Sequence, residues 1–229
     1  MDEPGGCGCE PGRCDPVGAV DPRIARRFDL RAGEWSNAPS LPEMVDVSAG
    51  LLAALDDVAA LHPSVLELGC GTGALSVALL ERGAARTTGV DLSEASLRLA
   101  RRRADEAGVG EFAAFSQGNA AAAAVEAHDW VILDRVVCCF EDADALVAAA
   151  IRAARQRIAI SVPESRGWRG LLNRLIWGAK SRWDEIHGGC RGYVHDLTRI
   201  EALLGAAGFH AVGSASTHIG RWYIGVYRR

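Results

Sequence analysis

The sequence has few of the features that tie a chain to a membrane or to nucleic acid. None of its apolar runs reaches the roughly 18 residues that a membrane-spanning helix needs. Its first residues lack the basic start and apolar stretch of a secretory signal. Lysine is nearly absent, since Lys180 is the only one, and the net charge of −4 provides no broad basic face for a polyanion. We therefore expect a cytoplasmic protein with neither a membrane nor a nucleic-acid partner.

The cysteines do not form the pattern of a disulfide framework. There are seven, an odd number, and a cytoplasmic chain keeps its thiols reduced. Cys7, Cys9 and Cys14 are candidates for three thiolate ligands to a soft metal, but their spacing is not a standard zinc pattern and no fourth ligand is evident. The interpretation favoured is a flexible tail with incidental thiols and no bound metal.

The composition is that of an ordinary globular protein. The chain has 229 residues, of which 49% are hydrophobic and 24% charged, enough for one domain with a sizeable core. Residues 1–20 are rich in glycine, proline and cysteine and show no apolar period, so they are predicted to be a flexible tail. Residues 21–229 are then expected to form a single domain.

Strand-like and helix-like segments alternate along this domain. Helices are predicted from Asp21 onward, over 42–60, from Ala74 to Arg82, from Ser93, over 142–155 and over 196–208. Strands are predicted to start at Ser64 and to cover 85–92, 111–119, 129–140 and 157–163, followed by two β-like segments at 209–219 and 221–229. The pattern predicts a Rossmann-like α/β fold with a seven-stranded, mainly parallel sheet and an antiparallel hairpin at its C-terminal end.

One glycine-rich segment carries most of the functional information. Residues 65–73, VLELGCGTG, end the first strand and open a helix, and their alternating glycines allow a sharp turn close to a ligand. Asp91 ends the second strand, 18 residues after Gly73. A carboxylate at that position can accept hydrogen bonds from both hydroxyl groups of a ribose. The sequence therefore predicts a nucleotide-type ligand at the carboxyl edge of the sheet.

Two ligand classes fit the loop. The series Gly69, Gly71 and Ala74 satisfies the dinucleotide fingerprint G-x-G-x-x-G/A, so a nicotinamide enzyme remains an alternative. Glu67, however, lies two residues before the first glycine, and an acid there suits a sulfonium-bearing zwitterion better than a pyrophosphate. The helical preface of some 60 residues also favours S-adenosylmethionine.

The E-x-G-x-G-x-G segment at 67–73, the VDLS segment around Asp91 and the acidic strand end at Asp134 resemble the class I S-adenosylmethionine-dependent methyltransferases. The resemblance covers roughly residues 42–229. It implies S-adenosyl-L-methionine as cofactor and S-adenosyl-L-homocysteine as product. Gly69, Gly71 and Gly73 would line the methionine and the ribose.

The resemblance implies further roles around the loop. Asp91 would bind the ribose diol and Leu92 would pack on the adenine. Glu67 would lie below the loop, holding it or reaching the methionine ammonium through water, and Asp134 would lie near the transferred methyl group. The resemblance also implies that Cys70, Asn119 and Ala120 belong to the cofactor-binding site. Where the family usually has an aspartate for the adenine amino group this chain has Asn119, whose amide can still accept without charge assistance.

A cap for the methyl acceptor is predicted after the fifth strand, at about 165–195. The tryptophan-rich segment there and Tyr193-Val194-His195-Asp196-Leu197 resemble the magnesium-protoporphyrin O-methyltransferases, which implies a hydroxyl or carboxyl acceptor on a partly apolar small molecule. Two interpretations of the cap stay open. Its apolar residues could pack on a core of their own, or its tryptophans could wall the acceptor pocket. The residues concerned are Trp168, Leu171, Leu172, Leu175 and Ile176 for the first, and Trp168, Trp177 and Trp183 for the second.

Methyl transfer from a sulfonium mainly requires alignment, and a base only where the acceptor must lose a proton. The candidate catalytic residues are His187, His195, Asp134 and Tyr193. A carboxylate acceptor needs no base but a positioning cation, for which Arg135 or Arg191 could serve. Over the cofactor, the predicted helix at 24–35 could form a lid through Phe28, Arg31 and Trp35.

Two rival functions also stay open. Cys138 and Cys139 follow Asp134 at the ligand-facing edge and could bind a thiophilic substrate such as arsenite, which would make the enzyme a metalloid methyltransferase. A catalytically silent cofactor-binding protein would have the same fold. The sequence leaves the oligomeric state open.

Overall fold

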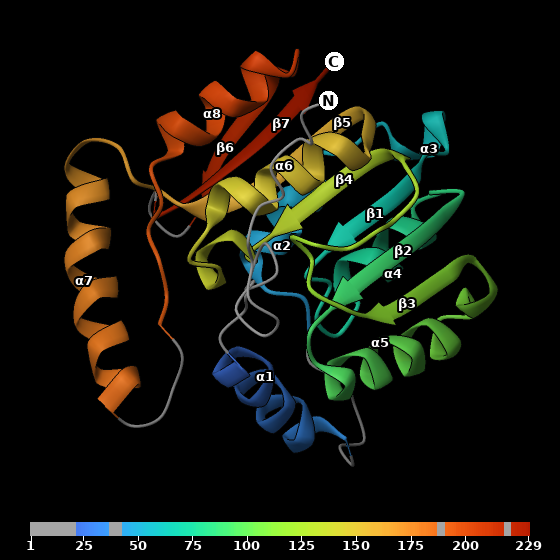
Figure 1. Ribbon diagram of the computed structural model, residues 1–229. Helices are drawn as coiled ribbons and strands as arrows, with labels where there is room; N and C mark the ends of the chain where they lie inside the picture. Colours follow the sequence, from blue (N-terminus) through green and yellow to red (C-terminus); the bar gives the residue numbers. More distant parts are fainter. Residues whose placement is uncertain (1–21, 37–42, 187–190, 218–220) are drawn as a thin grey trace, which may run out of the picture.

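The computed structural model describes residues 22–36, 43–186, 191–217 and 221–229 (Figure 1). Its strands are β1 (Ser64–Leu68), β2 (Arg86–Asp91), β3 (Ala113–Gln117), β4 (His128–Asp134), β5 (Ala154–Pro163), β6 (His210–Thr217) and β7 (Trp222–Arg228). Its α-helices are α1 (Pro22–Trp35), α2 (Asp46–Ala53), α3 (Val58–Leu61), α4 (Ala74–Glu81), α5 (Glu94–Glu106), α6 (Ala143–Ala153), α7 (Gly167–Ile186) and α8 (Leu197–Ala206). Two short 3-10 helices, η1 (Gly110–Phe112) and η2 (Val137–Cys139), follow α5 and β4.

The strands form one sheet in the order β3-β2-β1-β4-β5-β7-β6. Neighbouring strands among β1 to β5 pair in parallel, and β7 pairs antiparallel with both β5 and β6. The α/β class, the seven-stranded mainly parallel sheet and the C-terminal antiparallel pair are therefore confirmed. The strand order runs from β1 to β3 in one direction and from β4 to β5 in the other. The boundary between β1 and β4 is therefore the topological switch point, where ligands bind in such folds.

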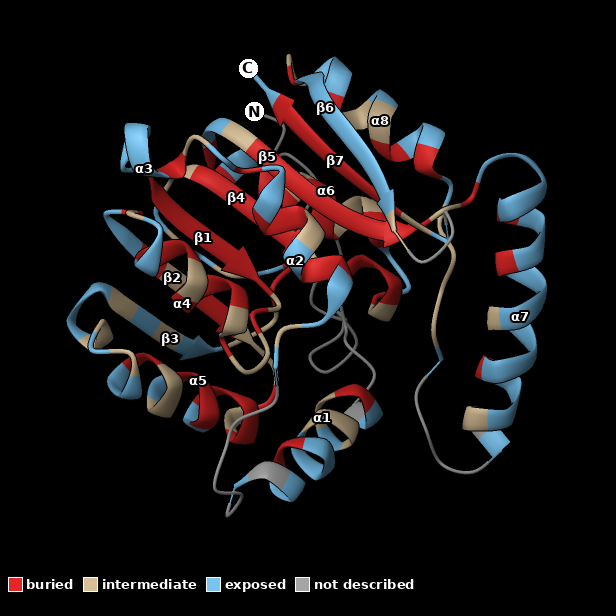
Figure 2. Cartoon of the chain, turned by 180° about the vertical axis from the view of Figure 1, so that it is seen from behind, coloured by how far each residue is buried: buried red, intermediate tan, exposed pale blue. Residues whose placement is uncertain are grey.

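Helices cover both faces of the sheet and bury its central strands. In β4, Trp130 and Ile132 pack in the cluster that includes α2 and α4, whereas Val131 and Leu133 pack in the cluster that includes α6 and α8. This alternation explains the continuous apolar run of β4, because both faces of a central parallel strand are buried. The edge strands β3 and β6 are mostly exposed, as the pale blue segments in Figure 2 show.

Two predicted element boundaries were wrong. The helix predicted over 42–60 is two helices, α2 and α3, separated by a turn at 54–57. Asp57 lies in that turn, where its carboxylate pairs with Arg157 on β5 at 2.6 Å, and aspartate favours turns over helix interiors. The strand predicted over 129–140 ends at Asp134, because Arg135 adopts a left-handed φ of 55° and the chain then forms η2.

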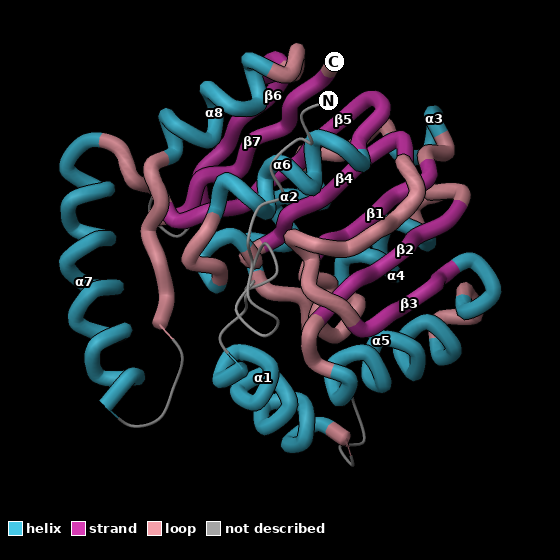
Figure 3. Tube along the Cα trace, in the orientation of Figure 1, coloured by secondary structure: helices cyan, strands magenta, loops and turns pink. Residues whose placement is uncertain are grey.

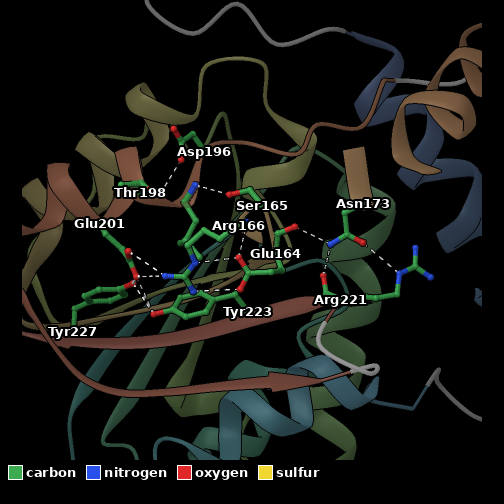
Figure 4. A network of polar contacts seen from close by, with 11 residues as sticks. Glu164, Ser165, Arg166, Asn173, Asp196, Thr198, Glu201, Arg221, Tyr223 and Tyr227 are labelled. Atoms are coloured by element: carbon green, nitrogen blue, oxygen red, sulfur yellow. Dashed lines mark hydrogen bonds and ion pairs between the residues drawn. The ribbon is translucent and has the colours of Figure 1, made fainter. Parts of the chain in front are cut away.

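Helix α7 begins on a polar network at the sheet edge (Figure 4). The Asn173 side-chain amide donates to the carbonyl oxygens of Glu164 at 2.8 Å and Arg221 at 2.9 Å. The backbone N–H of Leu197 donates to Ser165 Oγ at 2.8 Å and connects this region to the start of α8. The rest of α7 extends away from the sheet (Figure 1). Over the described ranges, no helix has the length and apolarity needed to cross a membrane.

Candidate active site

A cavity of about 440 Å3 lies at the carboxyl edge of the parallel strands. The loops after β1, β2 and β4 gather there on the side of α1, as the pink segments in Figure 3 show. Residues from these loops line one part of the cavity. The rest is lined by residues from α1, α7 and the start of β7, together with residues from 43–48 and 191–192. We refer to the first part, formed by residues 67–75, 91–96, 118–120 and Asp134, as the cofactor half. The part lined by α1, α7 and residues 135–140, 191–192 and 222 is the acceptor half.

The glycine loop needs glycine for two separate reasons. Gly69, Gly71 and Gly73 all have left-handed φ values, of 80°, 51° and 70°. A Cβ on Gly69 would lie 2.3 Å from Val136 Cγ2, and one on Gly73 would lie 2.8 Å from the Ala100 Cβ. At Gly71 no atom lies within 4 Å of such a Cβ. The outer glycines thus allow close packing, while Gly71 leaves open space in the cavity lining.

Asp91 connects the loop to the end of β2. Its Oδ2 accepts from the Gly71 backbone N–H at 2.8 Å, and its Oδ1 accepts from the Ser93 N–H at 2.9 Å. Burial raises the pKa of Asp91, although the backbone donors oppose that shift. Leu92 and Cys70 line the cavity beside it, and burial also raises the pKa of the Cys70 thiol. The carboxylate is therefore held in one orientation at the cavity wall.

Glu67 lines the same cavity from the end of β1 and is 3% exposed. Its Oε2 accepts a hydrogen bond from the Ser76 hydroxyl on α4. Burial, with a smaller contribution from the charges of Asp134 and Asp91, raises the pKa of Glu67 to about 8. At neutral pH Glu67 is thus mostly the neutral acid, which the motif alone did not predict. A cation in the cavity would favour the ionised form.

Asp134 ends β4 and also lines the cavity. Its Oδ2 accepts from the Ser48 hydroxyl on α2, and its Oδ1 accepts from the Ser161 hydroxyl on β5 at 2.5 Å. Neither serine was predicted from the sequence, because a single serine in a helix or a strand carries no pattern of its own. The sheet register, which pairs Asp134 with Ser161, is what brings that serine to the carboxylate.

Asn119 has a local structural partner. Its Oδ1 accepts from the backbone N–H of Ala121 at 3.0 Å, an arrangement typical of a turn. Its neighbours Gly118 and Ala120 line the cavity, but Asn119 is not among the lining residues. Binding of adenine by Asn119 stays a prediction.

Helix α1 lies over the cavity as the predicted lid. Phe28 and Arg31 line the cavity, and so does Arg27, which the sequence analysis did not single out. Asp29, on the same helix, accepts from the Ser93 hydroxyl at 2.6 Å and from the Ala95 N–H at 3.3 Å at the start of α5. These bonds dock the lid against the helix that follows Asp91. Of Trp35 only the backbone position is described.

The aromatic residues of the acceptor half differ from those expected. Trp177 lines the cavity, and its ring lies 5.9 Å from that of Trp222, which also lines it. Trp168 and Trp183 do not line the cavity and are 70% and 65% exposed. The interpretation that Trp168 and the leucines of this helix pack on a core of their own was also wrong, because those side chains face outward from α7.

Arg135 is the basic residue nearest the end of β4. Its guanidinium lies 5.9 Å from the ring centroid of Trp222. Arg191 also lines the cavity and lies 5.6 Å from the ring centroid of Tyr193. Within the described segments, no carboxylate forms an ion pair with either arginine. Both guanidinium groups are thus available to an anionic ligand.

Three of the four candidate catalytic residues lie in the described part of the chain. Of these three, Asp134 lines the cavity, and His195 and Tyr193 do not. The Nε2 of His195 donates to the Phe140 carbonyl oxygen at 2.8 Å, and its ring stacks on Tyr193 with a centroid distance of 5.5 Å. The Tyr193 backbone N–H donates to the Cys138 carbonyl oxygen at 2.8 Å. The predictions for His187, Cys7, Cys9 and Cys14 lie outside the described residues.

Cys138 and Cys139 both line the cavity. Their thiols point to the same acceptor, the carbonyl oxygen of Arg135, at 3.3 Å and 3.8 Å. The hydrogen bond between the two thiols raises the pKa of Cys138 and lowers that of Cys139, and Arg27 and Arg135 further lower the latter. In the part of the chain that is described, no group of three His, Cys, Asp or Glu residues is arranged to hold a metal ion.

Comparisons with known proteins agree with this geometry. The model of a family described as "Methyltransferase domain" matches residues 65–158. The ubiquinone biosynthesis O-methyltransferase of Hahella chejuensis is 32% identical over 143 residues, which cover 61% of this chain and 60% of that protein. That of Idiomarina loihiensis is 39% identical over 93 residues, covering 39% of this chain and 37% of that protein. The chain thus spans less than two thirds of the curated relatives that it matches.

Among solved structures, magnesium protoporphyrin IX methyltransferase from Synechocystis PCC 6803 with bound SAH has a TM-score of 0.67 at 24% identity. The match covers 90% of this chain and 98% of that chain. At this identity the structural likeness by itself shows a common fold. Residues 65–158 thus match a methyltransferase domain, and 90% of the chain shares its fold with magnesium protoporphyrin IX methyltransferase.

Proposed function

We propose that the protein transfers the methyl group of S-adenosyl-L-methionine to an oxygen atom of a small, partly apolar molecule and releases S-adenosyl-L-homocysteine. One observation carries the proposal. Glu67, Asp91 and Asp134, from the ends of three adjacent strands, line a single cavity with the glycine loop. Three acidic groups suit a ligand that bears an ammonium, a sulfonium and a ribose diol.

The same arrangement disfavours a dinucleotide. A pyrophosphate binds at a helix N-terminus through free backbone N–H groups of the glycine loop. Here the Gly71 N–H already donates to Asp91, and Glu67 lies buried beside the loop. A pyrophosphate would therefore compete with Asp91 for that donor and lie near two further acidic side chains.

The cofactor roles proposed for the chain follow the cavity lining. Asp91 holds the ribose diol, and Gly69 and Gly71 lie along the methionine and the ribose. Gly73 is not among the lining residues and packs against Ala100, so its place beside the ligand stays a prediction. Glu67 stabilises the methionine ammonium, directly or through water, once that cation favours its ionised form. Leu92 and Ala120 lie against the adenine. Asn119 Oδ1 accepts from the Ala121 N–H through one lone pair, and its second lone pair accepts from the adenine amino group.

A carboxylate is the acceptor that the acceptor half suits best. Phe28, Phe140, Trp177 and Trp222 supply an apolar, aromatic lining, and Arg135 supplies a cation without a carboxylate partner among the described residues. A carboxylate is already ionised at neutral pH and needs no general base. This agrees with an acceptor half that is lined by neither His195 nor Tyr193. Asp134 then orients the reacting groups rather than removing a proton.

The proposed enzyme acts on a small molecule in the cytoplasm, not on nucleic acid. The net charge of −4 supports this, because an RNA substrate requires an extended basic footprint.

The cofactor assignment is tested by calorimetric titration with S-adenosylmethionine and S-adenosylhomocysteine. Asp91→Ala is expected to abolish detectable binding, because it removes both ribose acceptors and releases the Gly71 N–H. Asp91→Asn is the matched control, since the amide keeps one acceptor oxygen, and it should retain weakened binding. Undiminished affinity in Asp91→Ala, or binding of NADH by the wild-type protein, contradicts the assignment.

The transfer step is tested with S-adenosylmethionine labelled in the methyl group and a panel of aromatic carboxylates and phenols. A methyl ester releases labelled methanol in mild alkali, whereas a methyl ether does not, so the product identifies the acceptor oxygen. Label that leaves with alkali supports the carboxylate, and stable label supports the hydroxyl. Tight cofactor binding with no transfer to any acceptor favours the catalytically silent alternative.

A second candidate, methylation of a thiophilic metalloid, is favoured by one observation. Cys138 and Cys139 both line the cavity with their thiols directed at one carbonyl oxygen. Trivalent arsenic would be held by such thiols. Arsenite should then protect both cysteines from alkylation, measured by mass spectrometry, and Cys138→Ser should remove the protection of Cys139. Unaltered labelling of both thiols contradicts this candidate.

A further inference from the structure

Helix α7 has a polar face toward the protein and an apolar face toward solvent. Gly170, Asn173, Trp177, Ser181 and Asp184 are buried or half-buried and lie on one side of the helix. Asn173 and Ser181 make hydrogen bonds across to the main body, Ser181 Oγ with both the N–H and the carbonyl oxygen of Gly192. The inward face of α7 is thus satisfied by polar contacts and by the cavity wall.

The opposite side of α7 is apolar and exposed. With about 3.6 residues per turn, the large apolar side chains lie diametrically opposite the inward face. They are Trp168, Leu171, Leu172, Leu175, Ile176, Trp183 and Ile186, and all seven are exposed. Leu171 and Leu175 are 61% and 64% exposed, and Figure 2 shows pale blue along most of the helix. We call these seven residues the outer face of α7. A contiguous exposed apolar face of this size marks an interaction surface.

Basic residues flank the outer face. Helix α7 contains four basic residues, Arg169, Arg174, Lys180 and Arg182, against two acidic ones, Asp184 and Glu185, although the whole chain has a net charge of −4. By helical position Arg169 and Lys180 lie along one border of the outer face, and Arg174 and Arg182 lie toward the other. The apolar face therefore lies within a local zone of positive charge.

We infer that the outer face of α7 binds the surface of an anionic lipid bilayer, with the helix lying in the plane of the headgroups. An apolar face containing tryptophan and leucine, with basic residues beside it, is the pattern of such interfacial helices. The three arginines would contact anionic headgroups, whereas Lys180 pairs with Asp184. The tryptophans near both ends suit the boundary between headgroups and acyl chains. The helix would lie on the bilayer without crossing it.

A second copy of the chain fits the outer face less well. A two-fold contact places the same patch against itself, so the four basic residues of one copy would face the four of the other. That arrangement carries like-charge repulsion at its border, whereas an anionic surface attracts both borders at once. The net charge of −4 led us to expect no membrane partner. That total does not reveal the basic zone on α7, because acidic residues elsewhere in the chain outweigh it.

The inward face of the same helix lines the cavity through Trp177, Lys180, Ser181 and Asp184. A second hollow, of about 360 Å3, is lined by Ile176, Trp177, Lys180, Arg221 and Trp222. Ile176 belongs to the outer face, and three of these residues also line the main cavity. An apolar acceptor dissolved in the bilayer would thus reach the cavity along α7. This consequence rests on the proposed function, but the binding of lipid does not.

Co-sedimentation of the full chain with lipid vesicles, in the absence of cofactor, tests the inference. The anionic vesicles contain phosphatidylcholine with about 30% phosphatidylglycerol, which gives roughly a physiological surface charge. They should bind the protein at least about tenfold more tightly than vesicles of pure phosphatidylcholine. Salt at about 0.5 M should weaken the binding, since it screens the headgroup charges. Trp168 and Trp183 should shift their fluorescence to shorter wavelength on binding.

Leu171→Asp with Leu175→Asp should weaken vesicle binding more than tenfold. Val212→Asp is the matched control, because Val212 is 60% exposed but lies on β6. Both proteins should keep wild-type affinity for S-adenosylhomocysteine, which shows that they fold and separates a failure here from a failure of the proposed function. The inference is overturned if the wild-type chain does not co-sediment with anionic vesicles. It is also overturned if the chain is a dimer by light scattering that the leucine substitutions dissociate, because a second copy then covers the outer face.

Discussion

The cofactor half and the acceptor half of the cavity are built in different ways. In the cofactor half, side chains at the ends of buried strands are fixed by short local bonds, such as those from Gly71 and Ser93 to Asp91. The acceptor half is contributed by α1 and α7, helices outside the sheet that are connected by a few polar contacts, among them Arg27 to Asp184 at 3.5 Å. The first half carries acidic groups, whereas the second carries aromatic and basic groups together with Asp184.

This difference indicates that the cofactor half is the more rigid part of the cavity. A loop attached to central strands inherits the packing of the core, so small changes there should be costly. Helices that lie over the edge of the sheet bury less and tolerate more change. The predictions below test that contrast, from the substitution expected to act most strongly to the one expected to act least.

Gly69→Ala should be the most damaging change. The new Cβ would lie 2.3 Å from Val136 Cγ2, at a φ of 80° that alanine adopts only with strain. We expect a loss of about 3 kcal/mol of unfolding free energy, the sum of a left-handed backbone and an overpacked contact. Urea titration measures it, and calorimetry should show that cofactor binding is lost.

Gly108→Ala is the matched control for that substitution. Gly108 also has a φ of 70°, but no atom lies within 4 Å of its Cβ position. It should lose only about 1–2 kcal/mol, the backbone cost alone. Equal losses in the two variants would contradict the view that packing against Val136 makes the loop rigid.

Glu67 should make cofactor binding depend on pH. Because the pKa of Glu67 is about 8 in the empty site, binding of a cation at pH 7 must displace a proton. Affinity for S-adenosylmethionine should then rise by at least about tenfold from pH 6 to pH 8. The calorimetric heat should also vary with the ionisation enthalpy of the buffer. Glu67→Gln should remove both effects, and a wild-type affinity independent of pH would contradict them.

The Glu67 carboxyl should also make the free energy of unfolding depend on pH. Whereas cofactor affinity rises with pH, the stability of the protein should fall. The pKa of Glu67 rises from an ordinary 4.5 to about 8 on folding, so its favourable contribution is complete below pH 4.5 and is lost as the pH rises through 8. Glu67→Gln should therefore gain stability relative to the wild-type chain between pH 6 and pH 8. A constant difference between the two proteins across that range would mean that Glu67 is ionised in the empty site.

Asp184→Asn should have the smallest effect. Asp184 pairs with Lys180 at 2.7 Å and with Arg27 at 3.5 Å, and the Lys180 side chain is largely exposed. Exposed pairs of this kind contribute about 0.5 kcal/mol or less. Thermal unfolding and cofactor affinity should stay close to wild-type values. A loss above about 1 kcal/mol would mean that the contact between α1 and α7 braces the fold, and that the two halves are equally rigid.

The sequence predicted the cofactor half well because its determinants are local. Gly69, Gly71 and Gly73 all have the left-handed backbone that only glycine adopts freely, and Asp91 follows them at the end of the next strand. The mainly parallel sheet and the C-terminal antiparallel pair also followed from the alternation of segments. The break after α2 and the early end of β4 were missed, because Asp57 and Arg135 respond to partners on β5.

The acceptor half could not be predicted in the same way. Even in the cofactor half, the two serines that bind Asp134, Ser48 and Ser161, lie on different elements far apart in the chain. The apolar period of α7 was visible in the sequence, but periodicity states that a helix has two faces and not which face turns inward. The structure turns the polar face inward and leaves Trp168 and Leu171 exposed.

By itself, the amino-acid sequence determined the sheet, the conformation of the glycine loop and the position of Asp91 beside it. These depend on backbone propensities and on alternation over a few residues. Tertiary structure alone decided the protonation of Glu67, the partners of Asp134 and the direction in which α7 presents its apolar face. Burial and charge at these sites are set by groups far away in the chain, and no local pattern encodes which of those groups will be adjacent.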